Sequence, residues 1–320
     1  MNAPDTGPGG GPGEDGGPAG RDGGRGAAPV AVGFDGSPES LAATGWAARE
    51  AALRRLPLAL LEAWPWPRTD VVGSDEVISA DRERLAGREA ELRAECAGIE
   101  VTSAHVHQDP VEALEGAART AALLVLGSRG LGTVHGFLVG SVGHQVLRRA
   151  ACPVVLVRAG WDAPPTGEGG KGAAPDARAR DVVVGVDLRR PCEELLAFAF
   201  EAAALRSAPL RIVHGWEPPV AGEYMGPAAV DGAARDLSAV DRDRLDALLR
   251  AWRDRRPEVE VTAALVHAPP PDALVGAAAT AALVVVGRYA RRWPLGTHLG
   301  PVAHAAVHHV GCPVAVVPHG

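Results

Sequence analysis

Residues 127–141 read GSRGLGTVHGFLVGS, and this stretch decides how the rest of the chain is interpreted. A short apolar run, LLVL, precedes it at 123–126, and a helical pattern follows at 142–150. A strand that breaks into glycines and then enters a helix can turn backbone N–H groups toward an anion. The pattern therefore predicts a phosphate-binding turn between a buried strand and a helix.

The glycines and the first residues of the helix are the candidate ligand-binding groups. Gly127, Gly130 and Gly140 permit positive φ and close approach of a ligand. The amides of Gly140, Ser141 and Val142 are expected to open the helix, where N–H groups lack partners and the helix dipole is positive. A glycine-rich turn that binds nothing is the alternative interpretation.

The stretch differs from two common phosphate loops. A Walker A loop needs a lysine after its second glycine, whereas Thr133 follows Gly132 here. The only lysine in the chain is Lys171, so no Walker A lysine is available. A dinucleotide fingerprint that starts at Gly130 needs a glycine where His135 stands, and it belongs after the first strand of a unit.

Outward from this stretch, apolar runs alternate with helical patterns. The expected strands are 30–33, 58–61, 100–107, 123–126 and 154–157, and the expected helices are 38–55, 74–97, 110–121 and 142–150. Ser37 followed by Pro38 is typical of a helix N-cap with proline in the first turn. Strands that alternate with helices predict a parallel sheet that helices cover on both faces.

The chain then repeats this pattern. Residues 181–187 align on 29–35 at an offset of 152, and beyond the charged helix the offset becomes 160, so that Gly287 aligns on Gly127. Two copies of one fold are the economical explanation. We predict a disordered Gly/Pro-rich tail at 1–28, a first domain at 29–159, a linker at 160–180 and a second domain at 181–320.

Composition narrows the class of protein. The chain has 320 residues, 47% of them hydrophobic and 22% charged, and a net charge of −7. This charge argues against a nucleic-acid or membrane-surface role. Four cysteines without a CxxC pair are typical of thiols in a reducing compartment, and no signal peptide or membrane-length run is recognisable, so we expect a cytoplasmic protein.

The spacing Gly-x2-Gly-x9-Gly-Ser at 127–141 resembles the ATP-binding signature of the universal stress protein family. The first strand with its VGFDGS continuation at 32–37 and the last strand, CPVVLV at 152–157, agree with this resemblance. It implies two tandem flavodoxin-like domains (adenine nucleotide alpha hydrolase-like), each a five-stranded parallel sheet. It also implies that the halves pair as family dimers do, through their last strands at 154–157 and 314–317. A further homodimer is left open.

The resemblance implies a set of ATP-binding residues. Asp35 matches the acidic group near adenine and ribose, although a helix N-terminal Asp stabilised by the dipole is the alternative. Ala63 matches the position whose backbone pairs with the adenine edge. The ribose- and phosphate-binding positions are Gly127, Gly130, Gly140, Ser141 and Val142. Arg129 supplies charge or is an exposed loop arginine. The implied cofactor is ATP, with or without Mg²⁺.

The second half departs from the signature. Ala290 replaces the second glycine, and Pro301 replaces the serine after Gly300. Pro301 has neither the hydroxyl nor the N–H of a serine, and the loss of two charge-assisted donors weakens binding by roughly 10²–10⁴-fold. Asp187 is kept. We therefore predict that the first half binds ATP and that the second half is empty or binds only adenosine.

Other candidate sites are weaker. His304 and His308 share a helix face, but two histidines fall short of a catalytic zinc site. His105 and His107 are expected to pack at a strand edge, and Cys152 and Cys312 to be buried thiols. The WPWP loop at 64–67 is expected to cover the core beside the nucleotide cleft, with an exposed recognition surface as the alternative.

Three functions follow from these residues. The leading hypothesis is an ATP-binding regulatory protein of the universal stress class, without efficient catalysis. The motif contains no carboxylate placed to hold magnesium and little to orient water, which an efficient nucleotide hydrolase needs. The alternatives are a weak ATPase or a phosphoryl or adenylyl transferase, and a nucleotide-independent interaction module. The protein partner is unknown.

Overall fold

The structure, a computed structural model, describes residues 27–64, 74–130, 137–138, 140–161, 181–217, 227–289 and 299–320. The predicted tail at 1–28 and linker at 160–180 lie almost wholly outside these residues, so both stay predictions. None of the described helices is both long and apolar enough to cross a membrane.

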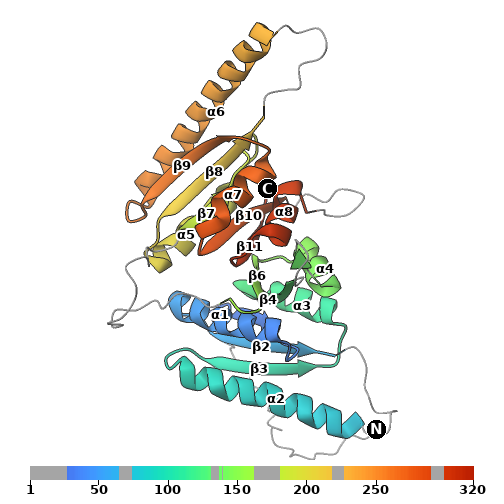
Figure 1. Cartoon of the computed structure of the whole chain (residues 1–320). Coiled ribbons are helices and arrows are strands. Elements are labelled where there is room, and N and C mark those ends of the chain that lie inside the picture. The colour runs from blue at the N-terminus through green and yellow to red at the C-terminus, as the bar shows by residue number, and fades with distance from the viewer. Residues whose placement is uncertain are drawn as a thin grey trace, which may run out of the picture.

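Both halves are built from alternating strands and helices (Figure 1). The first half contains β1 (Val30–Gly33), α1 (Pro38–Arg54), β2 (Leu58–Ala63), α2 (Ser74–Glu95), β3 (Val101–Val106), α3 (Pro110–Ala118), β4 (Leu123–Gly130), β5 (Phe137–Leu138), α4 (Ser141–Arg149) and β6 (Val154–Arg158). The second half contains β7 (Val182–Gly185), α5 (Glu193–Arg206), β8 (Leu210–Trp216), α6 (Pro227–Arg255), β9 (Val261–His267), α7 (Pro270–Ala277), β10 (Leu283–Tyr289), α8 (Pro301–His309) and β11 (Val314–His319). This order matches the pattern predicted from the sequence.

The strands form one continuous sheet in the order β3-β2-β1-β4-β6-β11-β10-β7-β8-β9. Neighbours within each half are parallel, which confirms the predicted five-stranded parallel sheets. The halves join where β6 and β11 run antiparallel, with Val155 opposite Ala315. The last strands therefore pair as the resemblance implied, and Figure 1 shows them at the centre of the molecule.

One short strand was not predicted. β5 pairs antiparallel with the end of β4, with Leu138 opposite Arg129 and Phe137 opposite Gly130. The glycine stretch therefore leaves β4 and returns alongside it before α4 begins. Residues 131–136 and 139, which connect these pieces, lie outside the described residues.

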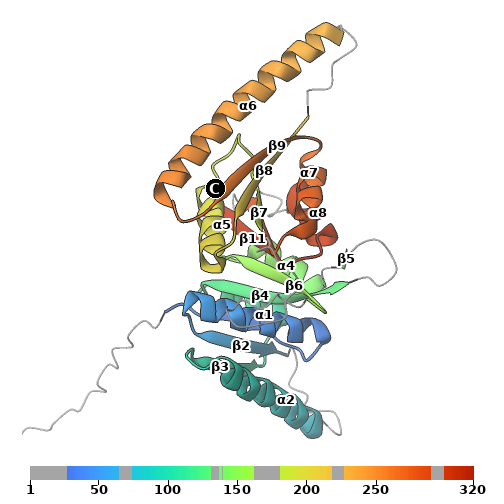
Figure 2. The ribbon, with the colours of Figure 1, turned by 60° about the vertical axis from the view of Figure 1, so that its left-hand side comes forward.

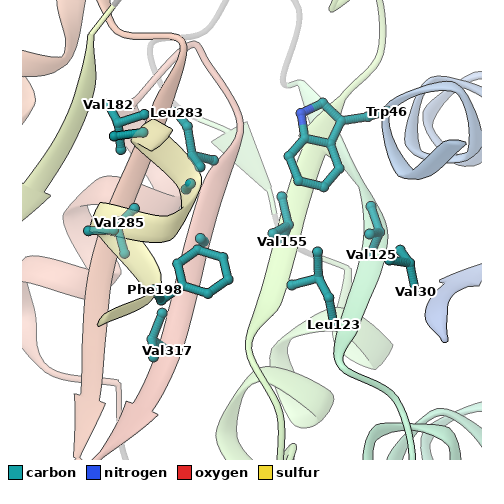
Figure 3. Close-up of a cluster of buried hydrophobic side chains, with 14 of the residues drawn as sticks. Val30, Trp46, Leu123, Val125, Val155, Val182, Phe198, Leu283, Val285 and Val317 are labelled. Atoms are coloured by element: carbon teal, nitrogen blue, oxygen red, sulfur yellow. The ribbon is translucent and has the colours of Figure 1, made fainter. Parts of the chain in front are cut away.

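Helices cover both faces of the sheet, and each face has a buried core that runs through both halves. The period of two in the strands explains this, because alternate side chains point to opposite faces. Val30 and Val32 belong to the core under α1 and α5, whereas Ala31 belongs to the core under α3 and α4. Figure 3 shows the first core, with Trp46 and Phe198 over the valines of the two half-sheets.

Helices α1 and α5 meet across the junction between the halves (Figure 2). The Glu50 carboxylate is 1% exposed and pairs with Arg54 of its own helix and with Arg206 of α5. The Arg54 guanidinium lies over the Phe198 ring and that of Arg206 over the Trp46 ring, at 5.3 and 5.8 Å from the ring centroids. Each half thus places an arginine over an aromatic ring of the other, around one buried carboxylate.

Candidate functional site

A cavity of about 400 Å³ lies at the carboxyl ends of β1, β2 and β4. The strand order reverses at β1, because the chain continues from β1 to β2 on one side and places β4 on the other. Such a switch point is where open α/β sheets bind ligands. The first turns of α1, α3 and α4 complete the wall, and the volume is within the range of small-molecule sites, about 300–1,000 Å³.

Seven of the eight predicted site residues line this single cavity. They are Asp35, Ala63, Gly127, Arg129, Gly140, Ser141 and Val142. The eighth, Gly130, is the last residue of β4 and pairs with Phe137. The fold thus brings together residues that are spread over more than a hundred positions of the sequence.

The N-terminus of α4 forms one wall of the cavity. Gly140 is the N-cap residue and no side chain caps this helix, while Ser141, Val142 and Gly143 line the cavity. The first N–H groups of a helix have no partner within the helix, and the dipole is positive there. Among the described residues, a Cβ at Gly140 would have no contact within 4 Å beyond its chain neighbours. The start of α4 therefore borders open space that an anion can enter.

Gly127 and Gly140 do not use the positive φ that glycine permits. Gly140 has φ −56°, and positive φ occurs instead at Gly36, in the turn between β1 and α1. Gly127 serves helix packing, since a Cβ there would lie 2.6 Å from the backbone carbonyl carbon of Glu39. Glycine at 127 lets the first turn of α1 approach β4 closely.

The Asp35 carboxylate lies at the end of β1 on the cavity wall. Its Oδ1 accepts a hydrogen bond from the backbone N–H of Ser37 at 3.0 Å. Burial raises the pKa of the Asp35 carboxyl, but hydrogen bonds from Ser37 and Ser40 and the positive charge of Arg129 lower it by more than burial raises it. The pKa of Asp35 therefore lies below its ordinary value. Asp35 is therefore an ionised hydrogen-bond acceptor at neutral pH.

Several polar residues of the wall were not predicted from the sequence. Glu62 is 3% exposed, and its carboxylate contacts Arg84 at 2.9 Å and His105 at 3.1 Å. Ser37 and Ser40 also line the cavity, and the Ser37 hydroxyl caps α1 by accepting from the Ser40 N–H. The signal for Glu62 was present, since it is the one charged residue in the apolar strand 58–63.

None of the candidate histidines and cysteines lines the cavity. The His304 and His308 rings lie 4.3 Å apart, but within the described part of the chain no three His, Cys, Asp or Glu residues are placed to hold a metal ion. Cys152 and Cys312 are buried, and burial raises the pKa of Cys152 to about 11. Trp64 lines the cavity, whereas Pro65, Trp66 and Pro67 are outside the described residues.

In the second half, side chains at the equivalent strand ends contact one another. The Asp187 carboxylate accepts from the Arg189 N–H at 3.0 Å and contacts the Arg190 guanidinium at 3.3 Å. Arg190 lies over the Tyr289 ring, and Tyr289, which takes the place of Arg129, contacts the His319 ring edge-on. We call Arg190, Tyr289 and His319 the Tyr289 cluster.

The Tyr289 cluster also packs against the glycine that corresponds to Gly127. A Cβ at Gly287 would lie 2.2 Å from Nε2 of His319, so this ring occupies the position that the α1 backbone takes in the first half. The ring is held by its Nδ1, which lies 3.0 Å from the Pro191 carbonyl oxygen. Ala290, which replaces the second glycine of the signature, is outside the described residues.

The first turn of helix α7 packs closely against the end of β8 in the second half. At Gly215, the counterpart of Ala63, a Cβ would lie only 2.6 Å from Cα of Pro270. In the first half Ala63 carries a Cβ and lines the cavity together with Pro110 of α3. Helix α7 therefore lies closer to β8 than α3 lies to β2, in the place where the first half has its cavity.

The comparisons with family models and with known proteins agree on one family. The model of the universal stress protein family matches twice, at residues 28–158 and 179–318. A universal stress protein of Mycobacterium tuberculosis strain H37Rv is 33% identical over 304 residues, which cover 90% of this chain and 96% of the relative. A second protein of that strain, also a universal stress protein, is 32% identical over 311 residues, covering 90% of this chain and 94% of the relative.

Solved structures share the fold. The crystal structure of a universal stress protein from Archaeoglobus fulgidus covers 91% of this chain and 98% of its own, with a TM-score of 0.64 and 17% identity. A universal stress protein from the same organism in complex with dAMP covers 40% of this chain and 96% of its own, with a TM-score of 0.32 and 24% identity.

Proposed function

Because the chain belongs to the universal stress protein family, we propose that it is an ATP-binding regulatory protein of the stress response whose first half holds the nucleotide. In this proposal, nucleotide occupancy sets the conformation or the choice of partner, and the protein works in the cytosol. The four cysteines are free thiols, which suits a reducing compartment.

The observation that carries the proposal is the cavity at the switch point of the first half-sheet. It combines an anion-binding wall at the N-terminus of α4 with an ionised acceptor, Asp35, on the wall formed by β1 and α1. Phosphates suit the free amides of Ser141 and Val142, and ribose hydroxyls suit a carboxylate. The apolar side chains of Leu61, Leu114 and Leu126, together with Ala63, suit a flat base.

Magnesium is expected to arrive with the nucleotide. Mg²⁺ keeps several waters and uses one or two carboxylates plus the phosphates of the substrate. Among the described residues there is no group of three metal-ligating side chains, so the protein would not hold the ion alone. Efficient hydrolysis needs a group that orients water at the γ-phosphate, and we propose none.

The proposal is tested by identifying what the purified protein binds. Mass spectrometry of the ligand released on denaturation should find ATP, and its absence together with no binding of added ATP would favour an interaction module. Gly140→Ala should weaken binding, because its methyl group enters the cavity without meeting any other described part of the chain. Gly300→Ala is the matched control, since Gly300 has the same role at α8 and equally open surroundings.

A second assay separates a binding protein from an enzyme. Labelled ATP incubated with the protein should give product at a rate close to the blank. Steady release well above the blank, lost in both Asp35→Ala and Gly140→Ala, would instead favour a weak ATPase or a transferase.

A further inference from the structure

The two ends of helix α4 have different surroundings. Its N-terminus faces the cavity, as described above, and its C-terminus is capped by Arg288 of the second half. Nη1 of Arg288 donates to the Arg148 carbonyl at 3.1 Å, and Nη2 donates to the Ala150 carbonyl at 2.5 Å. These are among the last carbonyls of a helix, which have no partner within it and carry the negative end of its dipole.

Arg288 is a fixed and buried anchor. Its side chain belongs to β10, whose neighbours are β7 and β11, and the residue is 5% exposed. Among the described residues no carboxylate lies within ion-pair distance, so the helix carbonyls compensate its charge. Burial lowers the pKa of the Arg288 guanidinium, which nevertheless stays protonated at neutral pH.

The arginines that cap α4 and α8 stand at different positions of the repeat. The position of Arg288 in the first half is taken by Ser128. The α8 helix is capped from the opposite side by Arg158 of β6, whose Nε donates to the Val310 carbonyl at 2.7 Å and whose Nη2 donates to the Val307 carbonyl at 3.1 Å. Each half thus caps the last helix of the other, through arginines at positions that are not equivalent in the repeat.

We propose that Arg288 is a positioning residue for the phosphate end of the ATP site, acting through α4. The proposal rests on the proposed function. Helix α4 has nine residues, about 13 Å, and so short a helix takes its place from its contacts rather than from its own stability. A shift at its C-terminus moves the whole helix, and with it the amides of Ser141 and Val142. In this way the second half supports the first.

The test compares Arg288→Met with Arg158→Met. ATP and adenosine affinities are measured by isothermal titration calorimetry on the full chain, and folding is checked by urea unfolding. Arg288→Met should weaken ATP binding about 10-fold, the loss of part of one charge-assisted hydrogen bond. Adenosine affinity should change less than about 2-fold, because adenosine has no phosphate to contact α4. Arg158→Met, which frees α8 instead, should leave both affinities unchanged.

Arg288→Lys serves where the methionine variant does not fold. The ammonium keeps a donor for the carbonyls, so ATP affinity should fall about 3-fold and adenosine affinity should stay constant. An equal loss of affinity for ATP and adenosine overturns the inference about Arg288 but leaves the proposed function intact. The same holds if the Arg288→Met protein binds ATP as tightly as wild type. A wild-type protein that binds adenosine but not ATP overturns the proposed function and the inference together.

Discussion

The two halves of this chain share one fold but treat the same strand ends in opposite ways. In the first half, the ends of β1, β2 and β4 open into a cavity of about 400 Å³ with free helix amides on one side. In the second half, the Tyr289 cluster and the first turn of α7 lie at the corresponding positions. A duplicated fold can thus keep its backbone while a few side chains change the surroundings of the same strand ends.

The largest expected effect comes from copying the second half into the first. Ser141→Pro removes the hydroxyl and the N–H at the position where α8 has Pro301. ATP affinity should fall by roughly 10²–10⁴-fold, the value of two charge-assisted donors. Proline is tolerated in the first turn of a helix, so urea unfolding should be nearly unchanged.

The reverse exchange is the control. Pro301→Ser restores the donors but leaves the Tyr289 cluster in place, so no second ATP should bind. A Ser141→Pro protein that binds ATP like wild type would show that the α4 amides do not hold the phosphates.

The next prediction concerns the stability of the junction between the halves. Glu50→Ala should lower the free energy of unfolding by about 3–5 kcal/mol, because it leaves the largely buried Arg206 without a carboxylate and Arg54 with only the exposed Glu201. Glu201→Ala removes the outer partner of Arg54, a carboxylate that is 47% exposed, and should cost about 0–1 kcal/mol. Urea unfolding measures both, and equal costs would mean that burial of Glu50 has no special role.

Alanine substitutions at the equivalent glycines Gly127 and Gly287 should change the free energy of unfolding by smaller amounts. Gly127→Ala places a methyl group 2.6 Å from the backbone of Glu39, so α1 must shift, at a cost of about 1–3 kcal/mol. Gly287→Ala meets the side chain of His319, which can rotate away, and should cost about 1 kcal/mol or less. Thermal unfolding of the two variants ranks them, and the reverse order would contradict this packing account.

The order of strands and helices could be predicted from local periodicity, and the pairing of the last strands from the resemblance to the family. The cavity-lining residues among 127–142 belong to one short motif, whereas Asp35 and Ala63 were matched through the resemblance. The contacts that distinguish the halves could not be predicted, because they join residues far apart, such as Arg190 with Tyr289 and Arg288 with Ala150. No periodic pattern marks such partners.

The packing role of Gly127 was missed for a related reason. A glycine that lets two backbones approach closely looks the same in sequence as one that adopts positive φ, and only the position of α1 distinguishes them. Glu62 was detectable as a charge in an apolar strand, but its partners Arg84 and His105 come from α2 and β3.

The smallest effect concerns Asp35 and pH. Its folded-state pKa is lowered, so its contribution to stability is complete above the unfolded pKa of about 3.9 and is lost as pH falls through the folded value. Since Asp35 is exposed, the contribution should stay below about 1 kcal/mol. Urea unfolding of wild type and Asp35→Asn should differ at pH 6 and converge near pH 2, and a gap that widens in acid would contradict the sign.

The most direct test of the difference between the halves is the number of ATP molecules that one chain binds. Isothermal titration of ATP into the full chain should give one site per chain, and that site should disappear in Ser141→Pro. Two sites per chain, or one site that survives Ser141→Pro, would contradict the proposal that only the first half holds the nucleotide.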